Sequence, residues 1–415
     1  MTSYQNITFG VELELMTPLP DSYRMWRFIS PSAASRFNMA DLLAKRTSLP
    51  IAAQCCHPPD DRCTICATVP KDNQFSGDCV LQFPEILSCG EIVSERCFIF
   101  KTEFLELAHP LSKERMWDGV EITTPVFHSG ELDSGLATMN TALTNLRQLD
   151  LQISADDSCG MHVHIGVETG MTILLAQKIA TLVILLENTL LLRLVAPPRW
   201  KSGFSMPICE NSSLAMDMDL HKSLEDPTTL NQHVPCMDAM KPGKWNNWYP
   251  QHIYKMLYGV WGSTILADLS LRLKKARVHR CGFAMSLRDH NVSVSDRGEN
   301  LEGSPTTVEF RYSQMTFDHE LLRNWTEILA RIVVIAQADA EEFKSCVGKI
   351  ISINGRDDKD VWKGLMMDVL GLGHRVPQWE EQLKRFEKVL TCSVSRVCLL
   401  QLAVDLGVQV VVYGI

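Results

Sequence analysis

Four short segments of this chain alternate polar and apolar residues with the period of a β-strand, at positions 8–15, 119–123, 160–168 and 307–313. Successive side chains of a strand point to opposite faces, so each segment has one apolar and one polar face. The apolar faces predict packing on a hydrophobic core. The chain is therefore constrained to a fold that contains a sheet with a polar face.

Longer segments with helical spacing lie between and after these strands. We expect helices over residues 33–45, 171–195, 254–275, 318–344 and 378–389, and further strands over 97–104 and 281–288. Strands that come both in runs and interleaved with helices are typical of α+β proteins. The prediction is an α+β fold in which helices back one face of a largely antiparallel sheet.

The polar faces of the four alternating segments have an unusual composition. They carry Glu12, Glu14, Glu121, His162, His164, Glu309 and Arg311, and no lysine. A surface strand with a solvated face explains any one segment taken alone. Taken together, carboxylates that converge on one sheet repel one another unless a cation compensates them. Hard oxygen ligands with one or two imidazoles suit Mg²⁺ or Mn²⁺, so the pattern predicts a divalent-metal site.

Arg311 follows Glu309 by two positions and shares its face of the strand. A guanidinium presents a planar fork of donors that matches the oxygens of a phosphate. A metal site beside an arginine indicates chemistry on a phosphoryl group.

The order of these segments carries a resemblance. The blocks at 9–14 (FGVELE), 119–125 (GVEITTP), 159–164 (CGMHVH) and 307–311 (TVEFR), with the segment 316–325, resemble the ordered motifs of the amidoligase family. That family belongs to the superfamily of glutamine synthetase and glutamate–cysteine ligase. The resemblance implies a glutamine synthetase-like sheet with a polar metal-binding face. It also implies an ATP-dependent carboxylate–amine ligase that forms an amide bond through an acyl phosphate, with Mg²⁺ or Mn²⁺.

The resemblance also implies roles for individual residues. The implied metal ligands are Glu12, Glu14, Glu121, His162 and Glu309. Arg311 would stabilise the transferred phosphoryl group beside Glu309, and His164 would face the acyl substrate.

Further cations are candidates for binding the nucleotide phosphates. Besides Arg311, these are Arg199, Lys201 and Arg288. For Arg199 and Lys201 the alternative is a helix end whose C-terminal dipole favours solvated cations. For Arg288 the alternative is a simple surface strand.

Composition limits the classes of partner. The 415 residues carry a net charge of −9, which argues against a protein that tracks nucleic-acid phosphates. We find no secretory signal, and charged residues interrupt the apolar tract 171–195, so we expect no membrane span. The 14 cysteines are then best explained as reduced thiols of a cytoplasmic protein. The expected partners are a small carboxylic acid and an amine or amino acid, and an oligomer is left open.

We expect a catalytic domain over residues 1–345, with a cysteine-rich insertion at about 50–78, and a C-terminal helical extension over 346–415 packed on the same domain. In the insertion, the spacing of Cys55, Cys56, Cys63 and Cys66 is that of a structural zinc site. Reduced thiols in a loop explain the same residues.

Two other functions use the same residues. One is a non-catalytic scaffold that keeps the fold. The other is a metal-dependent hydrolase that activates water, which needs neither a nucleotide nor Arg311.

Overall fold

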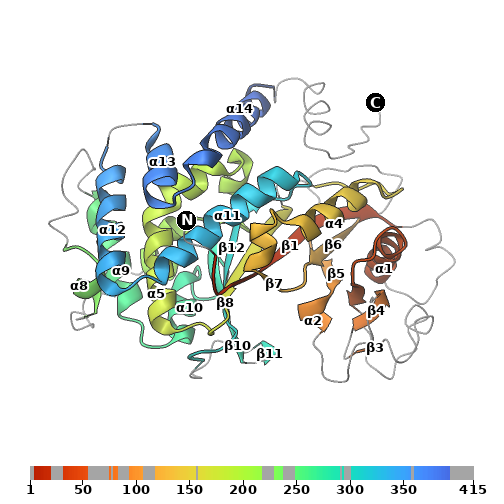
Figure 1. Cartoon of the computed structure of the whole chain (residues 1–415), viewed down its shortest axis with the longest axis horizontal. Helices are drawn as coiled ribbons and strands as arrows, with labels where there is room; N and C mark the ends of the chain where they lie inside the picture. The colour runs from red at the N-terminus through yellow and green to blue at the C-terminus, as the bar shows by residue number, and fades with distance from the viewer. Residues whose placement is uncertain are drawn as a thin grey trace. The chain divides into compact units, whose positions relative to one another are not determined.

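The protein is an α+β protein with a mostly antiparallel, mixed sheet backed by helices, as the sequence predicted (Figure 1). The structure is a computed structural model, and it describes residues 4–19, 31–54, 74–75, 78–82, 93–105, 117–155, 158–216, 229–236, 248–289, 292–293, 301–356 and 359–392. Two compact units are present. The first comprises residues 1–8, 163–313 and 324–387, and the second comprises residues 9–162, 314–323 and 388–415. Strands β1 (Ile7–Pro18) and β8 (Gly160–Val167) contribute residues to both units.

The second unit contains a sheet in the order β3-β4-β2-β5-β6-β1. Its other strands are β3 (Gln74–Phe75), β4 (Asp78–Gln82), β2 (Ile51–Gln54), β5 (Phe98–Glu103) and β6 (Trp117–Thr123), and β7 (Phe127–His128) pairs with β1. The β2–β5 pair is parallel, whereas β2–β4, β3–β4, β5–β6 and β1–β6 are antiparallel. Alternation along β1 buries Phe9, Val11, Leu13 and Leu15, which is the apolar face that the sequence predicted.

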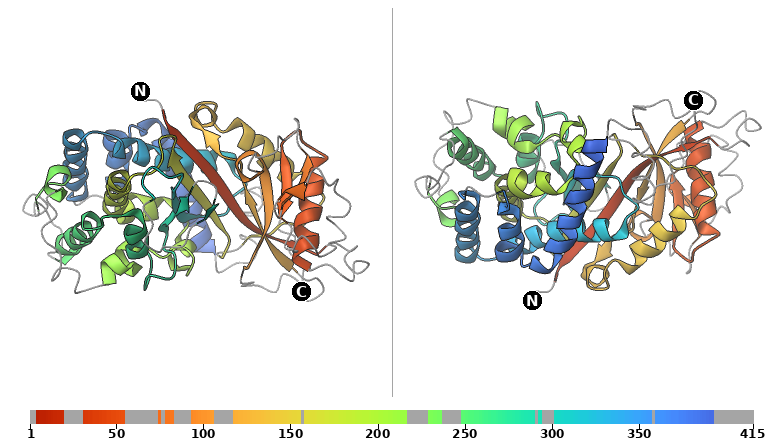
Figure 2. Two further views of the ribbon diagram at one scale, coloured as in Figure 1. Left: turned by 90° about the horizontal axis from the view of Figure 1, so that it is seen from below. Right: turned by 90° about the horizontal axis from the view of Figure 1, so that it is seen from above.

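Helix α1 (Pro31–Ala44) packs against β2, β5 and β6 of this sheet (Figure 2). Arg36 of α1 is fully buried there. Its guanidinium donates to the backbone oxygen of Gln54 in β2 at 2.6 Å and to the hydroxyl of Thr102 in β5, so these strands satisfy two of its buried donors. The shorter helices of this unit are α2 (Val93–Arg96), α3 (Ser129–Asp133) and α4 (Ala137–Arg147).

The first unit contains strands in the order β8-β12-β9, with β12 (Thr307–Gln314) antiparallel to β9 (Phe283–Ser286). The small strands β10 (Arg288–Asp289) and β11 (Val292–Ser293) form a separate pair. Helix α5 (Ile173–Leu186) lies beside α9 (Trp248–Trp261) and α12 (Ala340–Asn354), and α10 (Leu266–Leu273) packs against β9 (Figure 1).

The remaining helices of the first unit are mostly short. They are the π-helix η4 (Glu187–Leu191), η5 (Leu192–Leu194), η6 (Pro197–Lys201), α6 (Ile208–Asn211), α7 (Ser213–Met216), α8 (Leu230–His233), α13 (Val361–Gly364), η8 (Leu365–Val369) and η9 (Gly373–Arg375), with the longer α14 (Val376–Cys392). Helix α11 (His319–Ala336) ends in this unit. Trp325 of α11 meets Trp379 of α14 edge to face, with ring centroids 6.4 Å apart.

Two of the predicted helices are each divided in the structure. The segment 254–275 forms α9 and α10, because the chain turns at Ser263, whose backbone oxygen accepts a hydrogen bond from Gln177 at 2.8 Å. The segment 318–344 forms α11 and α12, because Asp339 caps α12 by accepting from the backbone N–H of Glu342 at 2.9 Å. Helical periodicity continues through both breaks, whereas the breaks themselves coincide with a long-range hydrogen bond at Ser263 and with the N-cap of α12 at Asp339.

Within the described residues, one helix is long and apolar enough to cross a membrane, over Ile173–Leu194, and 72% of its most apolar stretch is buried inside the protein. A core helix of a soluble protein has these properties. The prediction of a soluble protein is supported to this extent, and the cytoplasmic location stays a prediction.

The predicted domain division and the predicted zinc site are not decided by the fold. Of the C-terminal extension, described residues up to 387 group with the first unit and residues 388–392 with the second. The four cysteines proposed for zinc, Cys55, Cys56, Cys63 and Cys66, lie outside the described residues. The domain division and the zinc site stay predictions.

Candidate functional site

Three carboxylates of the second unit lie together on neighbouring strands. Glu14 of β1 is opposite Glu121 of β6, and Glu103 is the last residue of β5, the next strand of the sheet. One carboxylate oxygen from each lies within 4.8 Å of the others. Glu14 is only 5% exposed, so this is no freely solvated face. Strand alternation predicted the outward direction of Glu14 and Glu121, and the antiparallel register places them side by side.

Gly119 allows the strands that carry this cluster to approach. It is paired with Glu103 across β5 and β6, and a Cβ atom at this glycine would lie 2.2 Å from the backbone oxygen of Glu103. Any other residue would force the two strands apart. The glycine in the GVEITTP block is therefore required by packing beside the cluster.

The electrostatics of the cluster favour a bound cation. Burial, and next the charge of Glu12, raise the pKa of Glu121 from 4.5 to about 7, and Lys101 opposes this shift. The Lys101 ammonium lies 3.1 Å from a Glu121 oxygen. One lysine therefore compensates part of the negative charge that these glutamates carry when ionised.

His162 of β8 adds an imidazole beside these residues. It is 1% exposed, with Nδ1 3.3 Å from an oxygen of Glu12 and Nε2 3.5 Å from an oxygen of Glu14. The other oxygen of Glu14 accepts from the backbone N–H of Gly160 at 2.6 Å, which fixes its orientation. Carboxylate oxygens with one imidazole match the donors that Mg²⁺ and Mn²⁺ take, so these residues fit a divalent ion.

The first unit holds a second charged group around Glu309. This carboxylate is fully buried on β12 and forms ion pairs with two guanidinium groups, Arg280 at 2.9 Å and Arg311 on the same strand. The Nε2 of His164 lies 4.0 Å from Glu309, and its Nδ1 lies 3.2 Å from the hydroxyl of Thr307. Glu309 is therefore neutralised by arginines in this structure.

Arg199 supports this group through the backbone. It is 1% exposed, and its guanidinium donates to the backbone oxygen of Arg311 at 3.2 Å. The hydroxyl of Ser205 donates to the backbone oxygen of Arg199 in turn. This geometry ties Arg199 to β12, whereas the alternative of a solvated helix end required an exposed side chain. Its contact with a nucleotide stays a prediction.

The two other candidate cations lie elsewhere in the first unit. Lys201 is the last residue of the short helix η6. Arg288 is exposed on β10, and its backbone N–H donates to the hydroxyl of Thr306 at 3.1 Å. Neither is brought to Glu309 by a contact that the structure describes.

A buried carboxylate anchors β12 from the opposite side of the strand. Glu187 is fully buried at the start of the π-helix η4 and accepts hydrogen bonds from the Tyr312 hydroxyl at 2.5 Å and from the backbone N–H groups of Ile208 at 2.7 Å and Cys209 at 2.8 Å. Burial raises the pKa of Glu187 despite these donors. The anchor fixes Tyr312, the residue directly after Arg311.

The structure thus gathers the predicted residues in two groups, one in each unit. Glu12, Glu14, Glu121 and His162 meet in the second unit. His164, Glu309, Arg311 and Arg199 meet in the first unit.

Sequence reasoning did not assign roles to Glu103, Lys101, Arg280 and Glu187. Glu103 and Lys101 share one face of the predicted strand 97–104, which was the available signal. Arg280 ends a basic run that was left unused, and Glu187 was counted only as an interruption of an apolar helix.

Comparison of the chain with protein-family models, with characterised proteins and with solved structures finds no match, so the residues of these two groups carry the functional argument alone.

Proposed function

We propose that this protein is a divalent-metal-dependent ligase that uses ATP to join a small carboxylic acid to an amine. The observation that carries the proposal is the cluster of Glu14, Glu103 and Glu121, whose oxygens lie within 4.8 Å of one another beside a buried histidine. The second support is the resemblance of the motif order to the amidoligases. Both the metal and the nucleotide belong to the proposal.

Glu14, Glu121 and His162 would hold the divalent ion, together with Glu103, which the structure adds to the predicted set, and with Glu12. Bound Mg²⁺ or Mn²⁺ would supply positive charge to the phosphate oxygens of the nucleotide. Lys101 would reduce the net negative charge of these ligands, because its ammonium already pairs with Glu121 at 3.1 Å.

Arg311 and Arg280 would bind and orient the phosphoryl group that is transferred. In the structure both guanidinium groups contact the buried Glu309, which holds them in fixed directions. Charge spreads over the phosphoryl oxygens during transfer, and fixed donors stabilise that charge without reorganisation. His164, 4.0 Å from Glu309, would contact the acyl substrate.

In the proposed reaction a carboxylate oxygen of the acid attacks the terminal phosphorus of ATP, and ADP leaves. The amine nitrogen then attacks the acyl carbon, phosphate leaves with the bonding electron pair, and the nitrogen loses a proton. The net products are an amide, ADP and inorganic phosphate.

Metal binding is tested first, by following free Mn²⁺ with electron paramagnetic resonance as protein is added. We expect Glu121→Gln and Glu14→Gln to weaken Mn²⁺ binding at least tenfold, since each removes a charged oxygen ligand. Glu341→Gln is the matched control, because it removes an exposed carboxylate at the start of α12. Equal affinity in all four proteins would remove the metal from the proposal.

Activity is tested by ADP release with Mg²⁺ across a matrix of small acids and amines. Arg311→Lys keeps the charge but loses the planar fork, so we expect kcat to fall by about 10²-fold. Arg193→Lys, an exposed arginine of η5, is the control. ADP release that needs both an acid and an amine supports the ligase. Hydrolysis of a substrate without nucleotide would indicate the hydrolase, and failure to bind nucleotide with Mg²⁺ would indicate the scaffold.

A further inference from the structure

Glu187 is a buried carboxyl group that the proposed ligase chemistry does not use. It lies at the start of the π-helix η4, and short π-helices are frequent at functional sites. Its oxygens accept from the Tyr312 hydroxyl and from the backbone N–H groups of Ile208 and Cys209. An apolar side chain would fill this space without the cost of burying a carboxyl group. The hydrogen bonds of Glu187 therefore indicate a role beyond packing.

Tyr312 and Arg311 are neighbours on β12, so their side chains point to opposite faces of the strand. On one face the Tyr312 hydroxyl donates to Glu187 at 2.5 Å. On the other face the Arg311 guanidinium contacts Glu309. A rotation of the strand about its axis would move both side chains. The hydrogen bond to Glu187 therefore also limits the movement of Arg311.

Backbone hydrogen bonds connect Arg311 to the same carboxyl group by a second route. The backbone N–H of Arg311 donates to the backbone oxygen of Gly282 at 2.7 Å, and the N–H of Gly282 donates to the backbone oxygen of Met206 at 2.7 Å. Shortly after Met206, the N–H groups at positions 208 and 209 donate to Glu187 at 2.7 and 2.8 Å. Arg311 is thus tied to Glu187 through the backbone as well as through its neighbour on β12.

Gly282 is the point at which this backbone route meets the Tyr312 ring. A Cβ atom at Gly282 would lie 2.4 Å from a ring carbon of Tyr312, so the ring lies directly against the backbone that accepts from Arg311. The buried Arg199 donates to the backbone oxygen of Arg311 at 3.2 Å. Both backbone polar groups of Arg311 therefore have partners.

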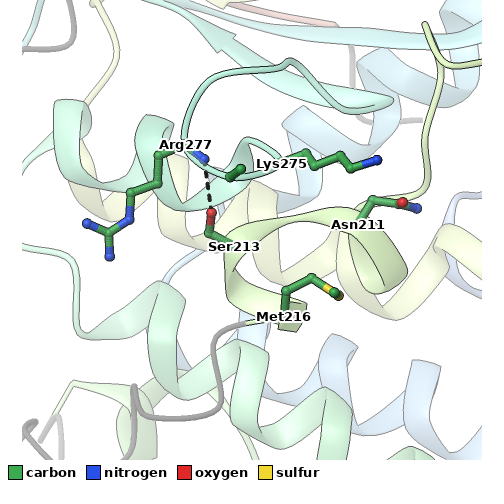
Figure 3. Close-up of a pocket in the computed structure, with 6 residues that line it drawn as sticks. Asn211, Ser213, Met216, Lys275 and Arg277 are labelled. Carbon is green, nitrogen blue, oxygen red and sulfur yellow. Dashed lines mark hydrogen bonds between the residues drawn. The ribbon is translucent and has the colours of Figure 1, made fainter.

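Arg280, the second arginine of the proposed phosphoryl site, precedes the same glycine by two residues. The chain before Arg280 is held by Ser213, whose hydroxyl donates to the backbone oxygen of Lys274 at 2.8 Å. The same hydroxyl accepts from the backbone N–H of Arg277 at 3.2 Å (Figure 3). The segment that carries Arg280 is therefore attached at both ends to residues 206–213, the stretch of chain that Glu187 also binds.

We propose that Glu187 and Tyr312 are positioning residues of the ligase. Their hydrogen bond fixes the placement of Arg311, and the bonds from positions 208 and 209 to Glu187 extend this effect to Arg280. The inference rests on the proposed function, because it concerns how accurately the two arginines meet the transferred phosphoryl group. Misplacement of a catalytic group by about 1 Å can lower a rate about 10²-fold.

The experiment measures how Tyr312→Phe changes binding of ADP with Mg²⁺, in the presence and absence of aluminium fluoride, by isothermal titration calorimetry. Aluminium fluoride beside ADP mimics the phosphoryl group during transfer, whereas ADP alone does not. We expect aluminium fluoride to tighten ADP binding to the native protein at least about 10²-fold. Tyr312→Phe should reduce this effect about tenfold and change the affinity for ADP with Mg²⁺ alone less than about twofold.

The same split is expected in turnover. With an acid and an amine that give ADP release, Tyr312→Phe should lower kcat about tenfold and leave the KM for ATP within about twofold, because the lost interaction matters only during transfer. A merely destabilised protein that remains folded at the measuring temperature shows no such split. Circular dichroism checks the fold of every variant at that temperature.

Thr181→Val is the matched control, because it also removes one buried hydroxyl from the first unit. That hydroxyl donates to the backbone oxygen of Gln177 at 2.8 Å and accepts from the Trp261 indole N–H at 3.0 Å, so it joins α5 to α9 and not to β12. We expect a similar loss of stability with an unchanged effect of aluminium fluoride.

Glu187→Gln is the second variant, which keeps the size of the side chain and replaces one acceptor oxygen by an amide donor. It should reduce the effect of aluminium fluoride as Tyr312→Phe does. The double variant should show less than the product of the two single effects, because both changes weaken the same hydrogen bond.

The outcomes separate this inference from the ligase proposal. A native protein whose ADP binding is not tightened by aluminium fluoride would contradict the ligase, and the positioning role with it. A native protein that responds, together with a folded Tyr312→Phe protein that responds equally, would overturn the positioning role alone. An equal reduction in Thr181→Val would also overturn it, since general destabilisation would then explain the effect.

Discussion

Asp118 shows how a single buried carboxyl makes stability depend on pH. It lies on β6 close to Arg36 and Ser35, and burial raises its pKa from 3.8 to about 6, although Ser35 and Arg36 act in the opposite direction. One of its carboxylate oxygens, Oδ2, has no hydrogen-bond partner among the described residues. The folded state therefore binds the proton more tightly than the unfolded state does.

Asp118→Asn is predicted to stabilise the protein at neutral and alkaline pH. With the folded pKa raised, the stabilisation from the protonated Asp118 is complete below about pH 3.8 and is lost as the pH rises through 6. Asparagine stays neutral, so its advantage is largest at pH 8. Allowing for partial solvent exposure, we expect about 1 kcal/mol at pH 8 and almost none at pH 3.5. Urea denaturation at the two pH values measures this, and an equal effect at both would contradict it.

Tyr312→Phe is predicted to destabilise the first unit. The hydroxyl donates to the buried Glu187 at 2.5 Å, and its removal takes one donor from a carboxylate that also accepts from the backbone N–H groups of Ile208 and Cys209. A buried hydrogen bond to a carboxylate is worth about 1–3 kcal/mol. Glu187→Ala should cost more, since it takes the acceptor from the Tyr312 hydroxyl and from the backbone N–H groups of Ile208 and Cys209 together. Denaturant unfolding compares the two, and a Tyr312→Phe protein as stable as the native one would contradict this account.

The close pairing of strands β5 and β6 requires a glycine at position 119. Gly119→Ala is predicted to cost about 1–3 kcal/mol, because its Cβ would lie 2.2 Å from the backbone oxygen of Glu103 and the strands must separate. Gly130→Ala in α3 is the matched control, as no atom lies within 4 Å of its added Cβ. We expect the control to be neutral or stabilising, because alanine favours a helix.

The same substitution tests the cluster itself. Separation of β5 from β6 moves Glu103 away from Glu121, so Mn²⁺ binding should weaken in Gly119→Ala and not in Gly130→Ala. Unchanged Mn²⁺ affinity in a folded Gly119→Ala protein would show that Glu103 is no ligand.

The elements were predicted well wherever one hydrogen-bonding pattern runs through the whole segment. The alternating segment 8–15 lies within β1, and the segment 160–168 matches β8 to within one residue at either end. The helix predictions over 254–275 and 318–344 missed breaks at Ser263, whose backbone oxygen accepts from the distant Gln177, and at Asp339, whose side chain caps the start of α12. Apolar periodicity does not report such hydrogen bonds, because the apolar spacing resumes in the following helix.

At the scale of the whole molecule, the question is whether the apolar helix over Ile173–Leu194 is buried inside the protein or lies in a membrane. Its interior carries polar residues that are satisfied by the protein: Gln177 donates to Ser263, and Lys178 donates to the backbone oxygen of Ala338 at 2.6 Å. Lipid supplies no such acceptors. We predict that the native protein stays in the aqueous phase on Triton X-114 phase separation, and enrichment in the detergent phase would contradict the buried helix.

The polar and apolar faces of the strands were determined by the sequence alone, because alternation is a local property of the backbone. Glu12, Glu14, Glu121 and His162 could therefore be named without a structure, and so could Glu309 with Arg311. The α+β class followed from the same local patterns.

Only the tertiary structure decided which of these residues meet. The register of β1, β5 and β6 brings Glu103 to Glu14 and Glu121, and the ion pair of Arg280 with Glu309 joins positions 29 residues apart. Register and long-range pairing depend on the packing of the entire sheet, and no local pattern contains that information. Burial, which raises the pKa of Glu121 and of Glu187, likewise exists only once the chain has folded.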